Sequence, residues 1–279
     1  MKRGIPAVRS PRHRRAAAAC ALALFGLAAE SRAQLFTLAS QNALHLGWGQ
    51  PAYQQNKETI LKQLFNSLDV IVVQEVMAQA NVANVTPGSH YFIVTPVQGP
   101  SSYREAYAFL VRSTIPVAPA GGYTISTIPG YARPPAGVLI GPGGTCNWVV
   151  DYHAVFGRSI SVRRAEVAHT RQVYQGFQAT VVNGHTCSRV VMAGDWNLGA
   201  NDPTFQTLAV GWPIQVAPNV PTSLKRNGGP SEPYDHFLWD TSVLTINSPL
   251  VIPVPNPPGS TLGWRNQVSD HLGIACQVQ

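Results

Sequence analysis

The sequence predicts one large α/β domain. Some apolar runs show no alternation and end in polar residues, as in Val190–Ala193 followed by Gly-Asp-Trp-Asn. Such runs are typical of buried strands in a sheet that is covered on both faces. Between them, residues 50–68 and 162–181 carry apolar side chains at helical spacing. No linker or charge block divides the chain beyond residue 33, so we expect a single domain over residues 34–279.

Residues 1–33 have the pattern of a secretory signal peptide. A basic stretch precedes the apolar run Ala16–Ala29, and Ser31-Arg32-Ala33 offers small residues for cleavage before Gln34. The run has 14 residues and is shorter than the ~18 that a membrane-spanning helix needs. The sequence therefore predicts a secreted or periplasmic protein with no transmembrane segment in its mature form.

The basic charge of the chain comes almost entirely from this leader. Residues 1–33 hold seven of the 20 Lys and Arg and one of the 13 Asp and Glu. The remaining 246 residues carry 13 basic against 12 acidic groups, a net charge of +1. Net charge is thus no evidence for nucleic-acid binding, and attraction to phosphate must come from local clusters or from a metal ion.

The first third of the domain predicts a strand, a helix, a strand and a hairpin. Leu35–Asn42 and Asp69–Val76 are apolar runs that end in Asn42 and in Gln74-Glu75. The helix between them carries an apolar stripe from Ile60 to Leu68. Residues 91–97 and 106–112 follow as a hairpin. Residues 113–145 are rich in Pro and Gly and predict irregular loop with short strands.

The second half repeats the strand–helix–strand order. Asn147–His153, the helix 162–181 and Val190–Asp195 predict a right-handed crossover between two parallel strands. A short helix over 203–210 and a strand over 234–239 come next. The proline-rich residues 249–258 predict extended loop, and 269–275 predict a last strand that Asp270 and His271 enter.

Three cysteines remain after the leader, an odd number for an exported protein. Cys146 precedes His153 by seven residues, and Cys187 precedes Asp195 by eight. If the two strands are parallel neighbours, both sulfurs lie at the same end, and we expect a Cys146–Cys187 disulfide. Cys276 is left as a thiol available to a covalent partner, although the chain itself is expected to be a monomer.

Polar side chains gather at the strand ends. Taken alone, Asp195 and Asn197 are explained equally well as loop formers that bond their own backbone. The repetition of the pattern favours a common site, whose members are Asn42, Glu75, His153, Asp195, Asn197, Asp235, Asp270 and His271. Carboxylate and amide oxygens suit Mg²⁺, with Mn²⁺ and Ca²⁺ as alternatives, and no Cys/His cluster has zinc spacing. Two histidines with acidic partners suit general acid–base chemistry.

These segments stand in the order of a known superfamily. Asn42, Gln74-Glu75, Ser102-Tyr103-Arg104-Glu105, His153, Gly194-Asp195-Trp196-Asn197, Tyr234-Asp235-His236 and Ser269-Asp270-His271 resemble the endonuclease/exonuclease/phosphatase superfamily. The deoxyribonuclease I branch is the better match, and the cytolethal distending toxin nuclease subunit is a looser one. The resemblance implies a four-layered α/β sandwich, with two mixed β-sheets packed face to face and helices outside.

The resemblance also implies roles for individual residues in metal-dependent hydrolysis of a phosphodiester. Glu75 binds the ion with Asn42 nearby, and Asp195, Asn197 and Asp270 complete the phosphate and metal site. His271, oriented by Asp235, is the general base. His153, paired with Glu105, acts as acid or holds the phosphate. Tyr103 lies along the substrate backbone.

The implied function is a secreted nuclease that hydrolyses DNA. One departure from the family pattern concerns the substrate: deoxyribonuclease I has an Arg after its metal-binding Glu-Val, and this chain has Met77 there. A phosphodiesterase for lipid headgroups, similar to a sphingomyelinase, is the first alternative. A toxin nuclease subunit that needs a delivery partner is the second.

Overall fold

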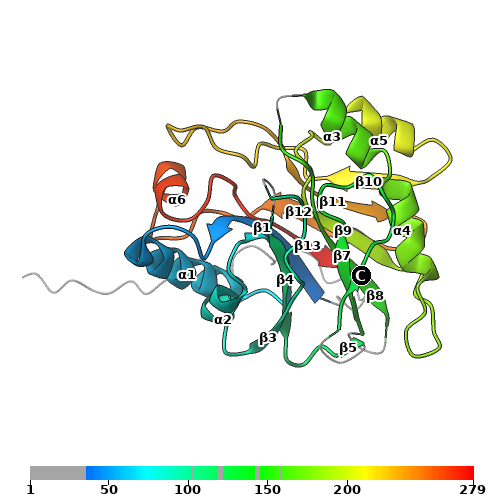
Figure 1. Ribbon diagram of the computed structural model, residues 1–279, viewed down its shortest axis with the longest axis horizontal. Helices are drawn as coiled ribbons and strands as arrows, with labels where there is room; N and C mark the ends of the chain where they lie inside the picture. The colour runs from blue at the N-terminus through cyan, green and yellow to red at the C-terminus, as the bar shows by residue number, and fades with distance from the viewer. Residues whose placement is uncertain (1–35, 102–103, 119–121, 142–144, 158) are drawn as a thin grey trace, which may run out of the picture. The chain divides into compact units, whose positions relative to one another are not determined.

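Two mixed β-sheets form the framework of the domain in the computed structural model (Figure 1). The structure describes residues 36–101, 104–118, 122–141, 145–157 and 159–279. These residues form one compact unit. The proposed leader, residues 1–33, lies outside the described residues, so its cleavage stays a prediction.

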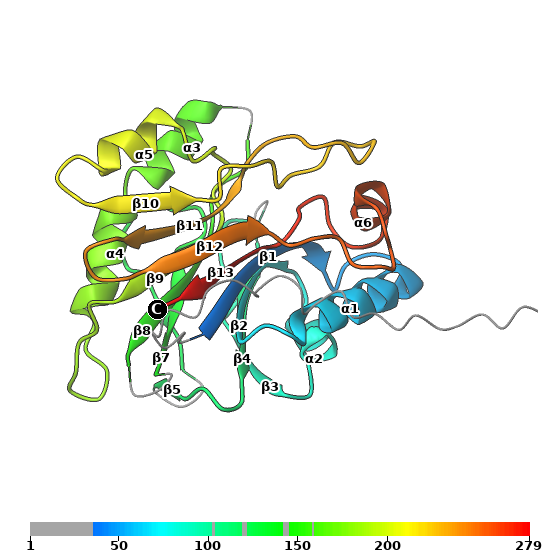
Figure 2. The ribbon, with the colours of Figure 1, turned by 180° about the vertical axis from the view of Figure 1, so that it is seen from behind.

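The first sheet, called sheet I, has six strands in the order β12-β13-β1-β2-β4-β3. In the described part of the chain, the β1–β2 pair is its only parallel pair, and the other neighbours are antiparallel. The half of the sheet that contains β12, β13 and β1 faces the viewer in Figure 2. Its strands are β1 (Phe36–Leu46), β2 (Val70–Val76), β3 (His90–Val94), β4 (Ala106–Arg112), β12 (Ile246–Val251) and β13 (Ile274–Val278).

The second sheet, called sheet II, has the order β10-β11-β9-β8-β7-β5, with β6 also paired to β7. Its only parallel pair among the described residues is β8–β9. Its strands are β5 (Val117–Ala118), β6 (Thr124–Ile125), β7 (Ala136–Ile140), β8 (Asn147–His153), β9 (Val190–Asp195), β10 (Ile214–Ala217) and β11 (Asp235–Asp240).

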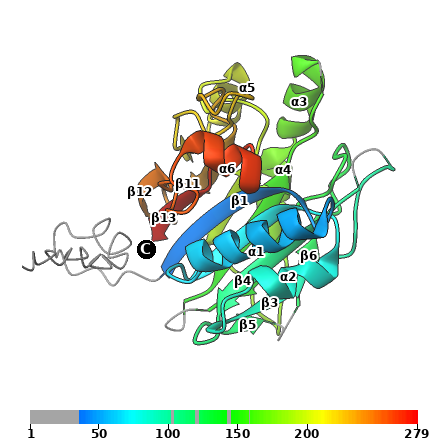
Figure 3. The ribbon, with the colours of Figure 1, turned by 90° about the vertical axis from the view of Figure 1, so that its left-hand side faces the viewer.

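Side chains from both sheets share one core, and helices cover the outer faces. Val72, Phe109, Val149 and Val191 belong to the buried cluster between the sheets. Outside sheet I, α1 and α6 lie beside each other (Figure 3). The domain is therefore the four-layered sandwich expected from the sequence. Its helices are α1 (Pro51–Phe65), η1 (Gln79–Asn81), α2 (Val82–Val85), α3 (Ile160–Val167), α4 (Thr170–Ala179), α5 (Pro203–Leu208) and α6 (Thr261–Gln267).

Most predicted elements are confirmed, with shifted boundaries. The helix expected over 50–68 is α1, which begins at Pro51, where a missing backbone N–H costs nothing. The helix expected over 162–181 is in fact two helices, α3 and α4. The chain turns between them, where the Thr170 hydroxyl donates to the carbonyl of Val167 (2.6 Å). The predicted parallel pair of strands is β8 and β9.

Two segments differ from the prediction, and a third is only more regular than expected. Ala136–Ile140 lies in the segment expected as irregular loop with short strands, and it is a fully buried strand of sheet II. Pro249–Val251, expected as loop, belongs to β12; proline is tolerated there because β12 is an edge strand. The last strand begins at Ile274, so Asp270 and His271 lie in the preceding loop. That loop bonds to residues 222–224 instead of continuing the ladder.

The predicted Cys146–Cys187 disulfide is present, with its Cα atoms 5.9 Å apart. It joins the segments that enter β8 and β9, at the end of these strands opposite to His153 and Asp195. Cys276 is unpaired and fully buried, and burial raises the pKa of its thiol well above the usual value. A covalent partner at Cys276 stays a prediction that this packing does not favour.

None of the helices in the described part of the chain is long and apolar enough to cross a bilayer.

Candidate active site

The parallel pair in each sheet brings polar residues to one edge of the sandwich. Asn42 and Glu75 lie near the carboxyl ends of β1 and β2, and His153 and Asp195 end β8 and β9 in direct register. Asp235 begins β11, opposite Asp195 in the antiparallel ladder. A pocket of about 380 Å³ opens at this edge. This central pocket is lined by Leu44, His45, Trp48, Glu75, Met77, Ser101, Arg104, Glu105, Arg133, His153, Phe156, Asp195, Asn197, Asp270 and His271.

The first histidine of the pocket, His153, is held by a carboxylate. Its Nδ1 lies 2.7 Å from Oε1 of Glu105, which is buried immediately before β4. Arg133 fixes this pair from behind: it donates to Glu105 Oε2 (3.3 Å) and to the carbonyls of His153 (3.2 Å) and Ala154 (2.7 Å). With Nδ1 bound to Glu105, the Nε2 atom faces the pocket.

The second histidine, His271, repeats this arrangement from another side of the pocket. Its Nδ1 lies 2.7 Å from Oδ2 of Asp235, which is fully buried. The Ser269 hydroxyl accepts from the His271 amide (3.0 Å) and donates to the carbonyl of Asn42 (2.7 Å). These two hydrogen bonds fix the loop that carries His271 against β1.

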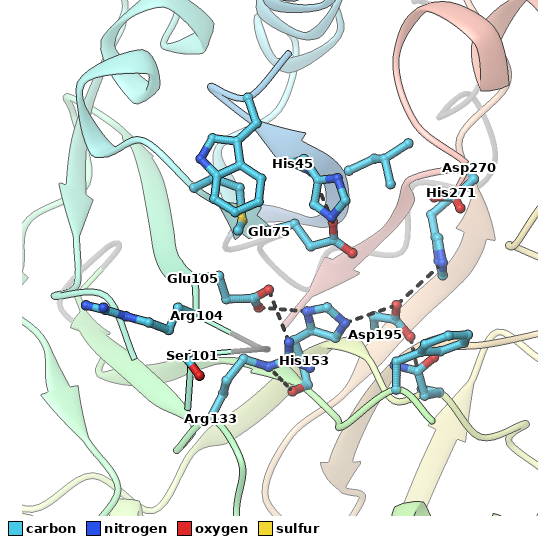
Figure 4. A pocket seen from close by; sticks show the side chains of 15 residues that line it. His45, Glu75, Ser101, Arg104, Glu105, Arg133, His153, Asp195, Asp270 and His271 are labelled. Atoms are coloured by element: carbon cyan, nitrogen blue, oxygen red, sulfur yellow. Dashed lines mark hydrogen bonds and ion pairs between the residues drawn. The ribbon is translucent and has the colours of Figure 1, made fainter. Parts of the chain in front are cut away.

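Asp195 lies where the two histidines converge (Figure 4). Its Oδ2 is 3.6 Å from Nε2 of His153 and 3.5 Å from Nε2 of His271. The Asn42 side-chain amide donates to the same oxygen (3.1 Å), and the Asn197 backbone amide donates to Oδ1 (2.9 Å). Asp195 is 1% exposed, so its charge is held by these donors rather than by solvent.

Glu75 joins the site from sheet I through the same asparagine. The Asn42 Nδ2 group donates to Glu75 Oε1 (3.0 Å) as well as to Asp195, so one amide links the two carboxylates. The His45 backbone amide donates to Glu75 Oε2 (3.0 Å). Glu75 has φ +59°, a left-handed conformation that is uncommon for a residue other than glycine, asparagine or aspartate.

A close backbone contact places Asp195. Gly194 pairs with Tyr152 in the β8–β9 ladder and has φ +149°. A Cβ atom at position 194 would lie 1.8 Å from the carbonyl oxygen of Tyr152. Only glycine fits, and Asp195 follows directly at the end of β9.

The carboxylates raise the pKa of both histidines. Burial favours the neutral rings, but Glu105 and then Asp195 outweigh it and hold the pKa of His153 above its usual 6.5. Asp235 and Asp195 do the same for His271, whose pKa lies well above 6.5. In the metal-free protein both imidazoles therefore keep a proton to higher pH than a free histidine does.

Replacing Asp235 by asparagine is expected to lower the pKa of His271 in the metal-free protein. Asp235 is the largest of the contacts that favour its imidazolium, and an amide has no charge. Because a raised histidine pKa stabilises the fold below pH 6.5 and loses that effect as pH rises through the folded pKa, the wild type should lose stability over that window. NMR titration of the ring in chelator-treated wild type and D235N measures the shift. Equal pKa values in the two proteins would contradict the assignment.

The donor set fits a divalent cation. Ligand atoms of Asp195, Asp235 and His271 lie within 4.8 Å of one another, and all three residues are buried. Asp235 Oδ1 has no hydrogen-bond partner among the described residues. Glu75 adds a carboxylate joined to Asp195 through Asn42. Buried carboxylate oxygens are the ligands that hard divalent ions prefer.

The remaining predicted residues divide into three cases. Asn197 lines the pocket, and its side-chain amide donates to the carbonyl of Ala154 (3.0 Å). Asp270 lines the same pocket beside His271. Tyr103 lies outside the described residues, so its contact with substrate stays a prediction. The side-chain oxygen of Asn42 accepts a hydrogen bond from the backbone amide of Leu44 (2.9 Å). Asn42 therefore presents N–H groups to the carboxylates and does not offer this oxygen to a metal ion.

Sequence reasoning missed Arg133 and Lys57, which contact residues behind the pocket lining, and noted Asp151 only for sharing a face with His153. Arg133 lies in the Pro- and Gly-rich segment 113–145 and belongs to no motif that the sequence analysis identified. Lys57 is buried on α1, where its ammonium donates to the carbonyls of Ala43 (2.8 Å) and Leu44, and burial lowers its pKa to about 8. Asp151, two residues before His153, is buried and accepts a hydrogen bond from Gln74 of the other sheet. Lys57 lies one helical turn before the Ile60–Leu68 stripe and on the same face, and a charge at that position was an available signal.

Comparisons with known proteins point to one family. The model described as "Endonuclease/Exonuclease/phosphatase family" matches residues 39–271. A humanized D. rerio TDP2 is 15% identical with a TM-score of 0.62, over 88% of this chain and 98% of that one. A mannosyl-6-phosphatase of Bacteroides thetaiotaomicron is 12% identical with a TM-score of 0.62, over 88% and 99%. The human Nocturnin catalytic domain is 15% identical with a TM-score of 0.57, over 88% and 94%. No curated protein matches the chain.

Proposed function

Because the chain belongs to the endonuclease/exonuclease/phosphatase family, whose members hydrolyse phosphoesters, we propose that it is a secreted, divalent-metal-dependent phosphodiesterase that acts on DNA as an endonuclease. One observation carries the proposal. Two carboxylate-backed histidines direct their Nε2 atoms at Asp195 on the floor of an open pocket. Such a pair can take a proton at one atom and give one at the other, as hydrolysis requires.

The two histidines divide the proton transfers between them. In its neutral form, His271 takes a proton from the attacking water at Nε2. Asp235 at its Nδ1 fixes the tautomer and stabilises the imidazolium that forms. His153 stands across Asp195 and donates from Nε2 to the leaving oxygen or to the phosphate. Glu105 and Arg133 keep that ring in place.

Glu75 and Asp195 would hold the cation, with Asp270 at the same pocket. Asp235 and His271 lie close to Asp195 but bind each other, and we assign them to proton transfer. A bound Mg²⁺, Mn²⁺ or Ca²⁺ supplies positive charge that neutralises the phosphoryl oxygens. The domain needs this charge because its mature net charge is only +1. Asn42 orients the two carboxylates from between them, and the Asn197 backbone amide bonds the second oxygen of Asp195.

DNA is the favoured substrate among the phosphoesters that related folds accept. The structural relatives include a D. rerio TDP2 in complex with a single-strand DNA product, 16% identical with a TM-score of 0.61, as well as the mannosyl-6-phosphatase. The fold alone does not separate these activities. The order of motifs and the His153–His271 pair favour the deoxyribonuclease-like chemistry. Export is supported by the Cys146–Cys187 disulfide, because such bonds persist in oxidising compartments.

A plasmid-nicking assay with and without EDTA tests the proposal. The purified domain, residues 34–279, should convert supercoiled plasmid to open circles in the presence of Mg²⁺ and lose that activity in chelator. Sphingomyelin and a phosphoinositide are assayed beside the plasmid under the same conditions. Hydrolysis of either lipid with intact plasmid would replace the nuclease by a lipid-headgroup phosphodiesterase, and activity that survives EDTA would exclude the metal-dependent chemistry.

A further inference from the structure

Two exposed aromatic side chains line the central pocket. Trp48 is 57% exposed and Phe156 is 63% exposed, although most large aromatic side chains of this domain are buried. Trp48 follows β1 of sheet I, and Phe156 follows β8 of sheet II, so the two rings come from opposite halves of the sandwich. The proton-transfer chemistry proposed above uses neither of them.

The Trp48 segment is held in place while its ring stays open to solvent. The Trp48 amide donates to the carbonyl of His45 (3.0 Å), and the buried Gln54 side chain binds both the Trp48 carbonyl and the Gly47 amide. The ring of His45 lies 5.8 Å from the indole, tilted by 43°. A ring on a fixed backbone loses little conformational freedom when a flat ligand stacks on it, which makes Trp48 a ready platform.

Apolar and basic side chains are also part of the pocket lining. Met77 and Leu44 belong to it, and Arg104 is an exposed positive charge there. Aromatic faces beside a basic residue are the usual means by which proteins bind single-stranded nucleic acid without reading its sequence. With a mature net charge of +1, the domain lacks the many phosphate contacts that bind duplex DNA tightly.

We propose that Trp48 and Phe156 stack on unpaired bases of single-stranded DNA that flank the scissile phosphodiester. The inference rests on the proposed nuclease function and deepens it by naming the form of the substrate. Bases in a duplex stack on each other and offer only their edges in the grooves, so their faces are closed to these rings. Unpaired bases offer both faces, and stacking tolerates every base because each has a π-face.

Kinetics on three matched substrates test the inference. These are a single-stranded oligonucleotide, its duplex, and a strand of the same length in which every nucleotide is an abasic unit. We expect the wild type to have its lowest KM for the base-bearing single strand. Trp48→Ala and Phe156→Ala should each raise that KM about 5- to 150-fold, the effect of losing one stacked base. Neither should change hydrolysis of the abasic strand, which reports on the catalytic groups alone.

Two further variants separate stacking from damage to the fold. Trp48→Phe should keep most of the affinity, because it keeps an aromatic face. Phe92→Ala removes an exposed aromatic ring on β3, outside the pocket lining, and should behave as wild type.

The possible results separate failure of base stacking from failure of the proposed nuclease function. If the wild type hydrolyses the strands but Trp48→Ala and Phe156→Ala leave the preference for base-bearing DNA unchanged, stacking is refuted and the nuclease stands. A wild type that hydrolyses none of the three with Mg²⁺ overturns the nuclease itself. Loss of binding to sphingomyelin vesicles, with DNA kinetics unchanged, would assign the two rings to a membrane surface instead.

Discussion

Replacing His271 by alanine is expected to lower phosphodiester hydrolysis by about 10²–10⁴-fold, the usual contribution of a positioned general base. The ring is the group at the pocket whose Nδ1 is bound to a fully buried carboxylate and whose Nε2 points at Asp195. Alanine leaves no atom there to accept a proton from water. Steady-state turnover at saturating Mg²⁺, with supercoiled plasmid as substrate, measures the loss.

The design must separate lost chemistry from lost stability, because the alanine leaves Asp235 buried without its partner. The double variant H271A/D235N removes that charge and should be as inactive as H271A while folding more stably. His90→Ala is the matched control, since His90 is also buried but lies on β3 with its ring on the carbonyl of Leu68. Turnover of H271A close to wild type would exclude His271 as the base.

Replacing Gly194 by alanine is expected to cost at least about 3 kcal/mol of the free energy of unfolding, through backbone strain and overpacking together. The added Cβ would meet the Tyr152 carbonyl oxygen at 1.8 Å, and neither atom belongs to a flexible side chain. The β8–β9 pair must separate to make room, and Asp195 moves with it. Urea unfolding followed by circular dichroism measures the change.

Gly176 provides the control for this substitution. It lies within α4, and a Cβ there meets nothing within 4 Å. Gly176→Ala should therefore be neutral or stabilise the domain by up to about 1 kcal/mol, because alanine is the better helix former. Equal urea midpoints for G194A and the wild type would show that the two strands are not packed as closely as described.

The strands were predictable where burial on both faces produces a continuous apolar run in the sequence. Val70–Val73 and Val190–Ala193 are covered on both faces, so every residue is apolar and the strand is evident. The division into two sheets carries no such signature, because it depends on which strands pair, and it came from the resemblance. Ala136–Ile140 was not placed within its segment of loop and short strands because its neighbours are Pro and Gly. The strand β12 was missed because a proline is typical of a loop unless the strand lies at the edge of a sheet.

The gathering of the polar side chains of the site at one edge was predictable from the sequence, and the hydrogen bonds between them were not. Glu75, His153 and Asp195 could be selected because each lies at the end of a predicted strand, and parallel strands bring their carboxyl ends to one edge. The link between the sheets through Asn42, and the Arg133 contacts behind Glu105, depend on side-chain direction across distant segments. No spacing along the chain encodes them.

The left-handed backbone conformation of Glu75 lowers the stability of the fold at a position where we propose that a carboxylate is needed for hydrolysis. A non-glycine residue held in such a conformation costs of order 1–3 kcal/mol, and asparagine or glycine would relieve much of that cost. Neither brings a carboxylate to Asn42 and Asp195. Selection for a stable domain alone would thus disfavour glutamate at position 75, and the metal-binding role that we propose for Glu75 would favour its retention. In lineages that have abandoned the reaction, drift to glycine or asparagine at this position should be among the earliest marks of the loss.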